Sequence, residues 1–356
     1  MSLPAATETS STHEALAGRR LGRWAIPGCA ALSIAIGAAL DLTGIATSAA
    51  AGVIAALTYV VTLTLASLRT EGKRHAVDRL ATTLIVASAL IAATPLVAIL
   101  GTVIVKGSQI ISIRFLLTSM RNVDPNSYLG GAYHAILGTL EQVGIAAAVG
   151  VPLGVLTAVY LVEYTGTSAS QWLARAISFF VDVMTGIPSV VVGLFVYSAF
   201  ILTLGLDRCG IAASIALVIL LIPVVVRSTE EMLRIVPRDL REASYALGIP
   251  KWRTILKVVL PTALAGIVTG AMLAIARVAG ETAPLLLTTF FTNSINANPA
   301  KGPQLALPTY IWDQFATGTP ASVARAWGGA LVLITIVMLL YLAAKLVARF
   351  SGARTH

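Results

Sequence analysis

Charge is scarce in this sequence. Charged residues make up only 12% of the 356 residues, whereas hydrophobic residues make up 57%. Soluble domains contain about 25% charged residues, so this composition excludes an ordinary soluble domain and a disordered chain. Two cysteines are too few for a disulfide scaffold. The mean hydropathy of +0.86 indicates a membrane protein instead.

Motifs for nucleotide hydrolysis and metal binding are also missing. The sequence has no Gly-x4-Gly-Lys-[Ser/Thr] pattern, so ATP would have to be hydrolysed by another chain. Its four histidines are scattered, without a His-Glu-x-x-His pattern or a cysteine pair, which argues against an intramembrane metalloprotease. We therefore expect no catalytic residue, no metal and no cofactor in this chain.

Long apolar runs are what the sequence has in abundance. About 20 apolar residues cross the roughly 30 Å hydrocarbon core of a bilayer. Runs of this length must be helical, because lipid offers no hydrogen-bond partners to an open backbone. We predict an all-α polytopic membrane protein with eight spans, at about residues 24–40, 45–68, 81–105, 136–162, 176–204, 210–226, 258–279 and 328–347.

The distribution of positive charge predicts the orientation. With the amino terminus in the cytoplasm, most of the 25 Lys and Arg residues fall on cytoplasmic segments, and Arg277 alone lies inside an apolar run. The positive-inside rule then favours a multi-pass membrane protein with both termini cytoplasmic. The net charge of +9 is explained by this orientation and requires no nucleic acid. Six basic residues fall outside: Lys106, Arg114, Arg121, Arg208, Lys301 and Arg325.

The amino-terminal part has two readings. We predict a disordered cytoplasmic tail over residues 1–23, followed by a transmembrane hairpin and a cytoplasmic linker over residues 24–80. The stretch from Arg19 to Leu40 also resembles a signal peptide, because basic residues precede an apolar run and small residues follow at 46–51. Either reading leaves the orientation of the later spans unchanged.

The longest hydrophilic run between two spans is residues 227–257. Pro237 opens a predicted helix that Gly248 ends, and Pro250 opens a second helix. Apolar residues form a stripe on each helix, so the loop is expected to fold as a compact amphipathic projection that needs a partner surface. An ordinary surface helix is the alternative.

This loop carries a recognisable spacing. Glu242-Ala243-Ser244, then Gly248, then Leu260-Pro261 resembles the EAA motif of ABC importer permeases, with Ser244 in place of an alanine. The resemblance implies that the loop docks on an ATP-binding subunit and transmits its closure to the membrane helices.

Arg277 and Glu281 are candidates for a transport pathway. An ionisable residue within an apolar run costs at least about 2.5 kcal/mol on insertion scales, so it usually faces a cavity or a partner. Arg277 and Glu281 are four residues apart, which would place them on one helical face and able to pair. Gly280 and Pro284 would let the helix break beside them, and a guanidinium suits an oxyanion. A structural ion pair is the alternative.

The stretch from Ala276 to Leu286 resembles the PstA family of phosphate ABC importer permeases, as does Gly186-Ile187-Pro188-Ser189 in an earlier span. The resemblance covers the chain from residue 81, and defines a six-helix permease core at 81–350 with a short cytoplasmic tail at 351–356. It implies phosphate as substrate and Arg277 and Glu281 as pathway residues. It also implies a PstC-like permease, a PstB-like ATPase dimer and a periplasmic phosphate-binding protein as partners. It gives no account of the amino-terminal hairpin.

Several alternatives stay open. Gly186 and Pro188 would form either a gate or a packing kink. The intramembrane acids Asp182 and Glu141 would pair with Arg277 or with a partner subunit. The substrate could be another oxyanion, such as molybdate or sulfate. An intramembrane enzyme is a further hypothesis, based on four residues near membrane depth: Glu141, Asp182, Glu281 and His134.

Overall fold

The computed structural model describes residues 21–45, 47–165 and 168–352, and all the regular structure in these ranges is helical. Seven helices are long and apolar enough to cross a membrane, and a sharply bent pair of helices would make an eighth span. The predicted fold class is confirmed. The chain divides into two compact units, residues 1–100 and 101–356, which we describe separately.

The smaller unit contains a helical hairpin and most of a third helix. Helix α2 (Ala25–Leu42) packs against α3 (Ser48–Thr70), and two residues separate α3 from α4 (Lys73–Ser108). The predicted spans underestimated α4, because its first turns carry charged residues that an apolar run excludes. Residues 1–20 of the predicted disordered tail, which was given as 1–23, lie outside the described residues.

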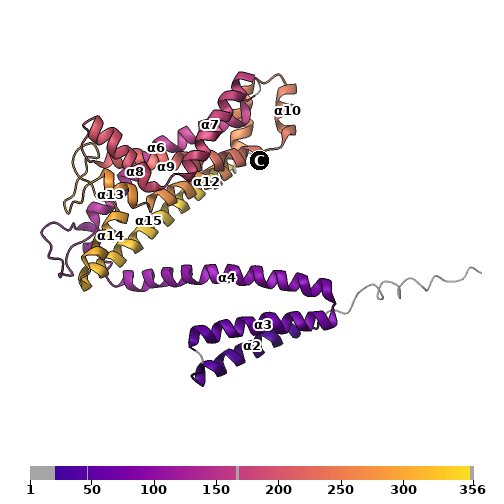
Figure 1. The fold of residues 1–356 in the computed structure, drawn as a ribbon. Coiled ribbons are helices and arrows are strands. Elements are labelled where there is room, and N and C mark those ends of the chain that lie inside the picture. The colour runs from indigo at the N-terminus through magenta and orange to yellow at the C-terminus, as the bar shows by residue number, and fades with distance from the viewer. Residues whose placement is uncertain (1–20, 46, 166–167, 353–356) are drawn as a thin grey trace, which may run out of the picture. The chain divides into compact units, whose positions relative to one another are not determined.

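Four long helices form the framework of the larger unit (Figure 1). Helix α9 (Gly210–Ile235) packs against α6 (Tyr133–Glu163) and α12 (Leu260–Ala279), and α12 also packs against α15 (Pro320–Gly352). The core along α9 combines bulky side chains with alanines of the neighbouring helices, which lets the helix backbones approach closely.

One predicted span is broken. Residues 176–204 were predicted as one span interrupted at Gly186 and Pro188, and α7 (Ser168–Gly186) and α8 (Ser189–Val196) meet there at an angle of 106°. Pro188 lacks a backbone N–H and the residue before a proline disfavours helical geometry, so the helix ends at Gly186. A π-helical segment, η1 (Tyr197–Thr203), continues α8.

Short elements lie at the two ends of the larger unit. Figure 1 shows α13 (Ala283–Thr288) and α14 (Leu307–Thr317) at one end and α10 (Arg238–Ala246) at the other. Helix α5 (Ile113–Leu117) precedes α6, and α11 (Lys251–Thr254) with the π-helical η2 (Ile255–Val259) leads into α12. Because α9 runs to Ile235, the first nine residues of the predicted hydrophilic loop are helical rather than loop.

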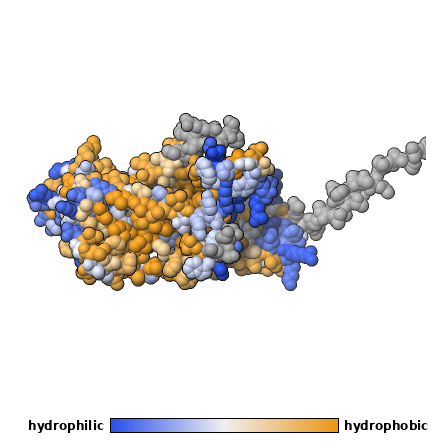
Figure 2. Space-filling model, turned by 90° about the horizontal axis from the view of Figure 1, so that it is seen from above, coloured by the Kyte–Doolittle hydropathy of each residue, from blue (hydrophilic) through white to orange (hydrophobic). Residues whose placement is uncertain are grey.

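The surface of the larger unit suits a bilayer. In Figure 2 hydrophobic residues cover the middle of the visible face, and hydrophilic residues gather towards its ends. Large apolar side chains on α7, α8 and α15 are exposed to the surroundings, which is the reverse of a soluble protein. They include Phe179, Phe180, Leu194, Phe195 and Leu339.

Candidate functional site

The end of α12 is the first part of the candidate site. The helix ends at Ala279, where the backbone N–H of Gly280 donates to Arg277 O and that of Glu281 donates to Val278 O, both at 3.2 Å. Glu281 therefore lies beyond the helix, and the expected shared helical face with Arg277 is wrong. Among the described residues no ion pair joins Arg277 to Glu281.

Arg277 lies on the open side of α12. The stripe Thr262, Ala265, Thr269, Leu273 and Arg277 is exposed, whereas the other faces of the helix are covered by α9 and α15. Thr262 and Thr269 donate their hydroxyls to carbonyls of their own helix, which leaves Arg277 as the stripe's open polar group. A cation in this position needs a partner surface or an aqueous path.

The two predicted helix breaks meet in space. Helix α8, which follows the Gly186 to Pro188 break, packs against α13, which follows Gly280 and begins around Pro284. A Cβ on Gly193 would lie 2.6 Å from Pro284 Cα, so only glycine permits this approach. Two motifs about 90 residues apart in the sequence therefore form one contact in the fold.

The second part of the candidate site is the projection made by α10 and α11. The N–H of Gly248 donates to Tyr245 O and that of Ile249 to Ser244 O, which is a Schellman ending for α10. Gly248 has φ +73°, a left-handed conformation that favours glycine. Pro250 stands immediately before α11, as the sequence predicted.

Side-chain contacts fix this projection to the membrane helices. The Ser244 and Thr254 hydroxyls form a buried hydrogen bond of 2.8 Å between α10 and α11. Arg241 pairs with Glu163 at the end of α6 at 2.9 Å, and donates to the carbonyls of Leu233, in the last turn of α9, and Val236, just beyond it. Glu242 and Ala243 are exposed, and so available to a partner.

The projection continues directly into α12. Helical structure runs without interruption from Lys251 to Ala279, with Leu260 and Pro261 at the start of α12. At about 1.5 Å per residue this rod is roughly 40 Å long. It joins α11 at one end to Arg277 at the other, so a displacement of the projection would be carried to the candidate pathway.

The other intramembrane acids have partners within the chain. Asp182 pairs with Arg227, which also pairs with the buried Glu230 at 2.6 Å. Glu141 accepts from the amide of Gln304. Neither acid contacts Arg277, so the expectation that they pair with it is wrong. The four residues of the enzyme hypothesis are spread over separate clusters, and no group of metal ligands occurs among the described residues.

Sequence reasoning missed a buried arginine. Arg325 was assigned to an outer loop, but it lies in α15 and is only 1% exposed. Its guanidinium donates to Gln314 Oε1 at 2.8 Å and to the carbonyls of Pro125, Ser127 and Leu129. The sequence gives little sign of this burial, because the three carbonyl acceptors are about 200 positions away and only Gln314 is near in sequence.

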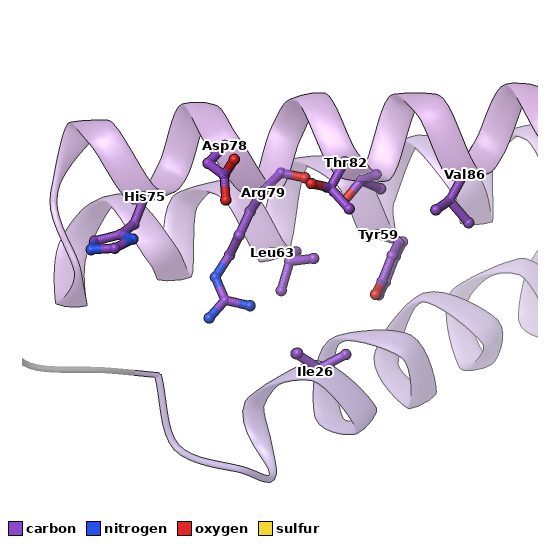
Figure 3. Close-up of a pocket in the computed structure, with 9 residues that line it drawn as sticks. Ile26, Tyr59, Leu63, His75, Asp78, Arg79, Thr82 and Val86 are labelled. Atoms are coloured by element: carbon purple, nitrogen blue, oxygen red, sulfur yellow. The ribbon is translucent and has the colours of Figure 1, made fainter. Parts of the chain in front are cut away.

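The smaller unit has a groove of about 470 Å³ (Figure 3). Tyr59 and Leu63 of α3, Ile26 of α2 and Arg79 of α4 line it. Beside it, Arg79 binds both carboxylate oxygens of Glu71, at 2.7 and 2.9 Å. This guanidinium, helped by the backbone N–H of Leu21, lowers the pKa of Glu71 from 4.5 to about 2.

Comparisons with known proteins agree with this architecture. The sequence profile of the family described as "Binding-protein-dependent transport system inner membrane component" matches residues 150–355. A solved chain of a bacterial alginate ABC transporter superposes with a TM-score of 0.54 at 15% identity, covering 77% of this chain and 96% of the other. The profile begins after the amino-terminal hairpin, which it therefore leaves unassigned.

Closer relatives are phosphate permeases. The phosphate transport system permease protein PstA 1 of Mycobacterium tuberculosis (strain ATCC 25618 / H37Rv) is 50% identical over 236 residues, which cover 66% of this chain and 75% of the relative. The corresponding PstA protein of Yersinia pestis is 42% identical over 224 residues, 63% of this chain and 74% of the relative.

Proposed function

Because the chain belongs to the family of binding-protein-dependent transport system inner membrane components, we propose that it is the membrane-spanning permease subunit of an ATP-driven phosphate importer. The assignment of phosphate as the substrate rests on the 50% identity to a phosphate permease over 236 residues. The chain works as a multi-pass inner-membrane subunit with a separate ATPase and a binding protein. ATP hydrolysis belongs to the ATPase.

The exposed stripe of α12 supports a shared pathway. A lone arginine facing lipid is unfavourable, so the stripe that ends at Arg277 packs against a second permease, of PstC type. Arg277 then lies between two subunits and offers phosphate a planar set of donors. Glu281, half-buried just beyond α12, and the α8–α13 contact flank the same passage, with Gly186, Pro188, Gly280 and Pro284 as its helix breaks.

The projection of α10 and α11 supports the coupling role. Its exposed Glu242 and Ala243 face a PstB-type ATPase dimer in the cytoplasm, and Gly248 fixes the angle between the two helices. Closure of the dimer moves the projection, and the rod from Lys251 to Ala279 carries this movement to Arg277. Both termini are cytoplasmic in this arrangement, and a periplasmic phosphate-binding protein delivers substrate to the opposite side.

Reconstituted uptake tests the substrate and the pathway. The full chain is assembled in vesicles with its permease partner, ATPase and binding protein, and ATP-dependent uptake of labelled phosphate is measured against excess molybdate or sulfate. We expect only unlabelled phosphate to compete. Arg277→Leu should reduce uptake at least about 100-fold, because the site loses its charged donor. Lys345→Leu, which removes an exposed cation from α15, is the matched control.

The coupling role is tested by Glu242→Lys. Reversing an exposed charge on α10 should release the ATPase or uncouple its activity from uptake. The measurement is co-purification of the ATPase together with ATP-dependent uptake. Intact co-purification with normal uptake would contradict the coupling role while leaving the phosphate assignment in place.

A further inference from the structure

A second cavity lies apart from Arg277, at the foot of the projection. It is an open cavity with a volume of about 680 Å³, lined by the end of α6, the end of α9 and helices α10 and α11. Four cations and two carboxylates line it, which makes its lining net positive. The cations are Arg234, Arg238, Arg241 and Lys251, and the carboxylates are Glu163 and Glu242.

Two of these cations are already neutralised. Arg241 pairs with Glu163, with side chains 14% and 6% exposed, and also binds two backbone carbonyls. Arg234 pairs with Glu230 at 2.5 Å. Both therefore fix the walls of the cavity, and their charges are balanced within the protein.

The other two cations have no such partner. Among the described residues no carboxylate lies within ion-pair distance of Arg238 or Lys251. Lys251 Nζ lies 5.2 Å from the centre of the Tyr164 ring, a contact that orients the ammonium without neutralising it. Arg238 and Lys251 thus bring two positive charges to one cavity from two different helices, against one unpaired carboxylate of the lining, Glu242.

We propose that this cavity binds a phosphate-type oxyanion through Arg238 and Lys251. A guanidinium and an ammonium together supply directed donors and a point charge, the combination that phosphate groups prefer. The cavity is large enough for a hydrated anion or for the phosphodiester of an anionic lipid, and a basic pocket beside membrane helices suits either source. A bound anion would link Arg238 of α10 to Lys251 of α11, and so brace the coupling projection.

The site differs from the transport pathway. Arg277 and the cavity lie at opposite ends of the rod from Lys251 to Ala279, so an anion here is bound on the coupling side. The inference rests on the proposed function only for the choice of inorganic phosphate as the free anion. Its experiment is therefore carried out in the Arg277→Leu background, where pathway binding is removed.

Binding is measured on the purified full chain. Labelled inorganic phosphate is titrated in a neutral detergent by equilibrium dialysis, and phosphatidylglycerol retained from mixed phosphatidylglycerol–phosphatidylcholine nanodiscs is counted by native mass spectrometry. We expect Arg238→Gln combined with Lys251→Gln to weaken the binding of either phosphate or phosphatidylglycerol at least about tenfold. Arg253→Gln combined with Lys257→Gln removes the same charge from exposed positions outside the cavity and should retain binding.

The outcomes separate the two sources. Loss of phosphate binding identifies the free anion, and loss of retained phosphatidylglycerol alone identifies the lipid headgroup. Arg238→Lys combined with Lys251→Arg keeps both charges, and should preserve binding if the glutamine variant fails through charge rather than folding. Equal binding by both glutamine variants, or no binding in either arm, would overturn the inference. Failure of the proposed function would appear separately, as uptake unaffected by Arg277→Leu.

Discussion

Two arginines in long helices of the larger unit have opposite surroundings. Arg325 in α15 is 1% exposed and is surrounded by Gln314 and three backbone carbonyls. Arg277 in α12 is exposed, and no hydrogen bond or ion pair satisfies its guanidinium among the described residues. The guanidinium of Arg325 is thus hydrogen-bonded on every side, whereas that of Arg277 has no partner among the described residues.

The difference separates structure from function. A buried cation is tolerated only when donors and acceptors are matched, and Arg325 meets this condition by joining α15 to α14 and to the loop before α6. Arg277 leaves its donors available to something outside the chain. We infer that Arg325 stabilises the fold and that Arg277 serves transport.

The largest expected effect on stability belongs to Arg325→Leu. Its removal leaves Oε1 of the buried Gln314 without its donor and frees the loop carbonyls, which lie near the surface and can bind water. We therefore expect a loss of about 2 to 3 kcal/mol, less than for a fully buried pair. Chemical unfolding in detergent measures it. Arg277→Leu should change stability by less than about 0.5 kcal/mol, and equal losses would break the comparison.

The close approach of α8 and α13 gives the next effect. In Gly193→Ala the new Cβ would lie 2.6 Å from Pro284 Cα, so a backbone must shift, at a cost of about 1 to 3 kcal/mol. Gly144→Ala is the matched control, because nothing lies within 4 Å of its Cβ and the change should stabilise α6 slightly. Unfolding midpoints and uptake are compared. If Gly193→Ala and Gly144→Ala change the unfolding midpoint and uptake in the same direction, the α8–α13 contact does not shape the passage.

Local signals made much of this site predictable. Pro237, Gly248 and Pro250 bound two short helices because proline and glycine act on their own backbone, and the structure contains both helices. Arg277 was identifiable from its apolar context alone. The prediction that Arg277 and Glu281 share a helical face was wrong. Gly280 already indicated that the helix ends before Glu281.

The pairing of residues that are far apart in the chain could not be predicted from the sequence. Asp182 binds Arg227 across 45 positions, and Arg325 binds carbonyls about 200 positions away, so neither partner can be read from neighbouring residues. The bend at Pro188 was visible as a helix break, but its angle of 106° depends on the packing of α8 against α13 and α9. Hydrophobic runs specify where helices form, whereas the packing of helices against each other determines which side chains pair.

A smaller effect is expected at Gly248. Because its φ is +73°, Gly248→Ala places a side chain in the left-handed region at a cost of about 1 kcal/mol. Gly248→Asn should cost less, since asparagine tolerates this conformation. Unfolding in detergent gives the cost, and the ratio of phosphate imported to ATP hydrolysed gives the coupling. If alanine and asparagine behave alike, the backbone angle does not determine the orientation of the projection.

The smallest effect concerns a third arginine, Arg79, which a carboxylate satisfies. Because the pKa of Glu71 is lowered to about 2, its stabilising contribution is complete above about pH 4.5 and is lost as the pH falls through about 2. Limited pepsin digestion between pH 4.5 and 2 should therefore cut the α3–α4 junction increasingly as the pH falls. Glu71→Gln should show only the pH dependence of pepsin itself, so the ratio of wild-type cutting to variant cutting should rise as the pH falls. If this ratio does not change with pH, Arg79, unlike Arg325, contributes no measurable stability. The inference that a hydrogen-bonded arginine stabilises the fold would then hold only for buried arginines.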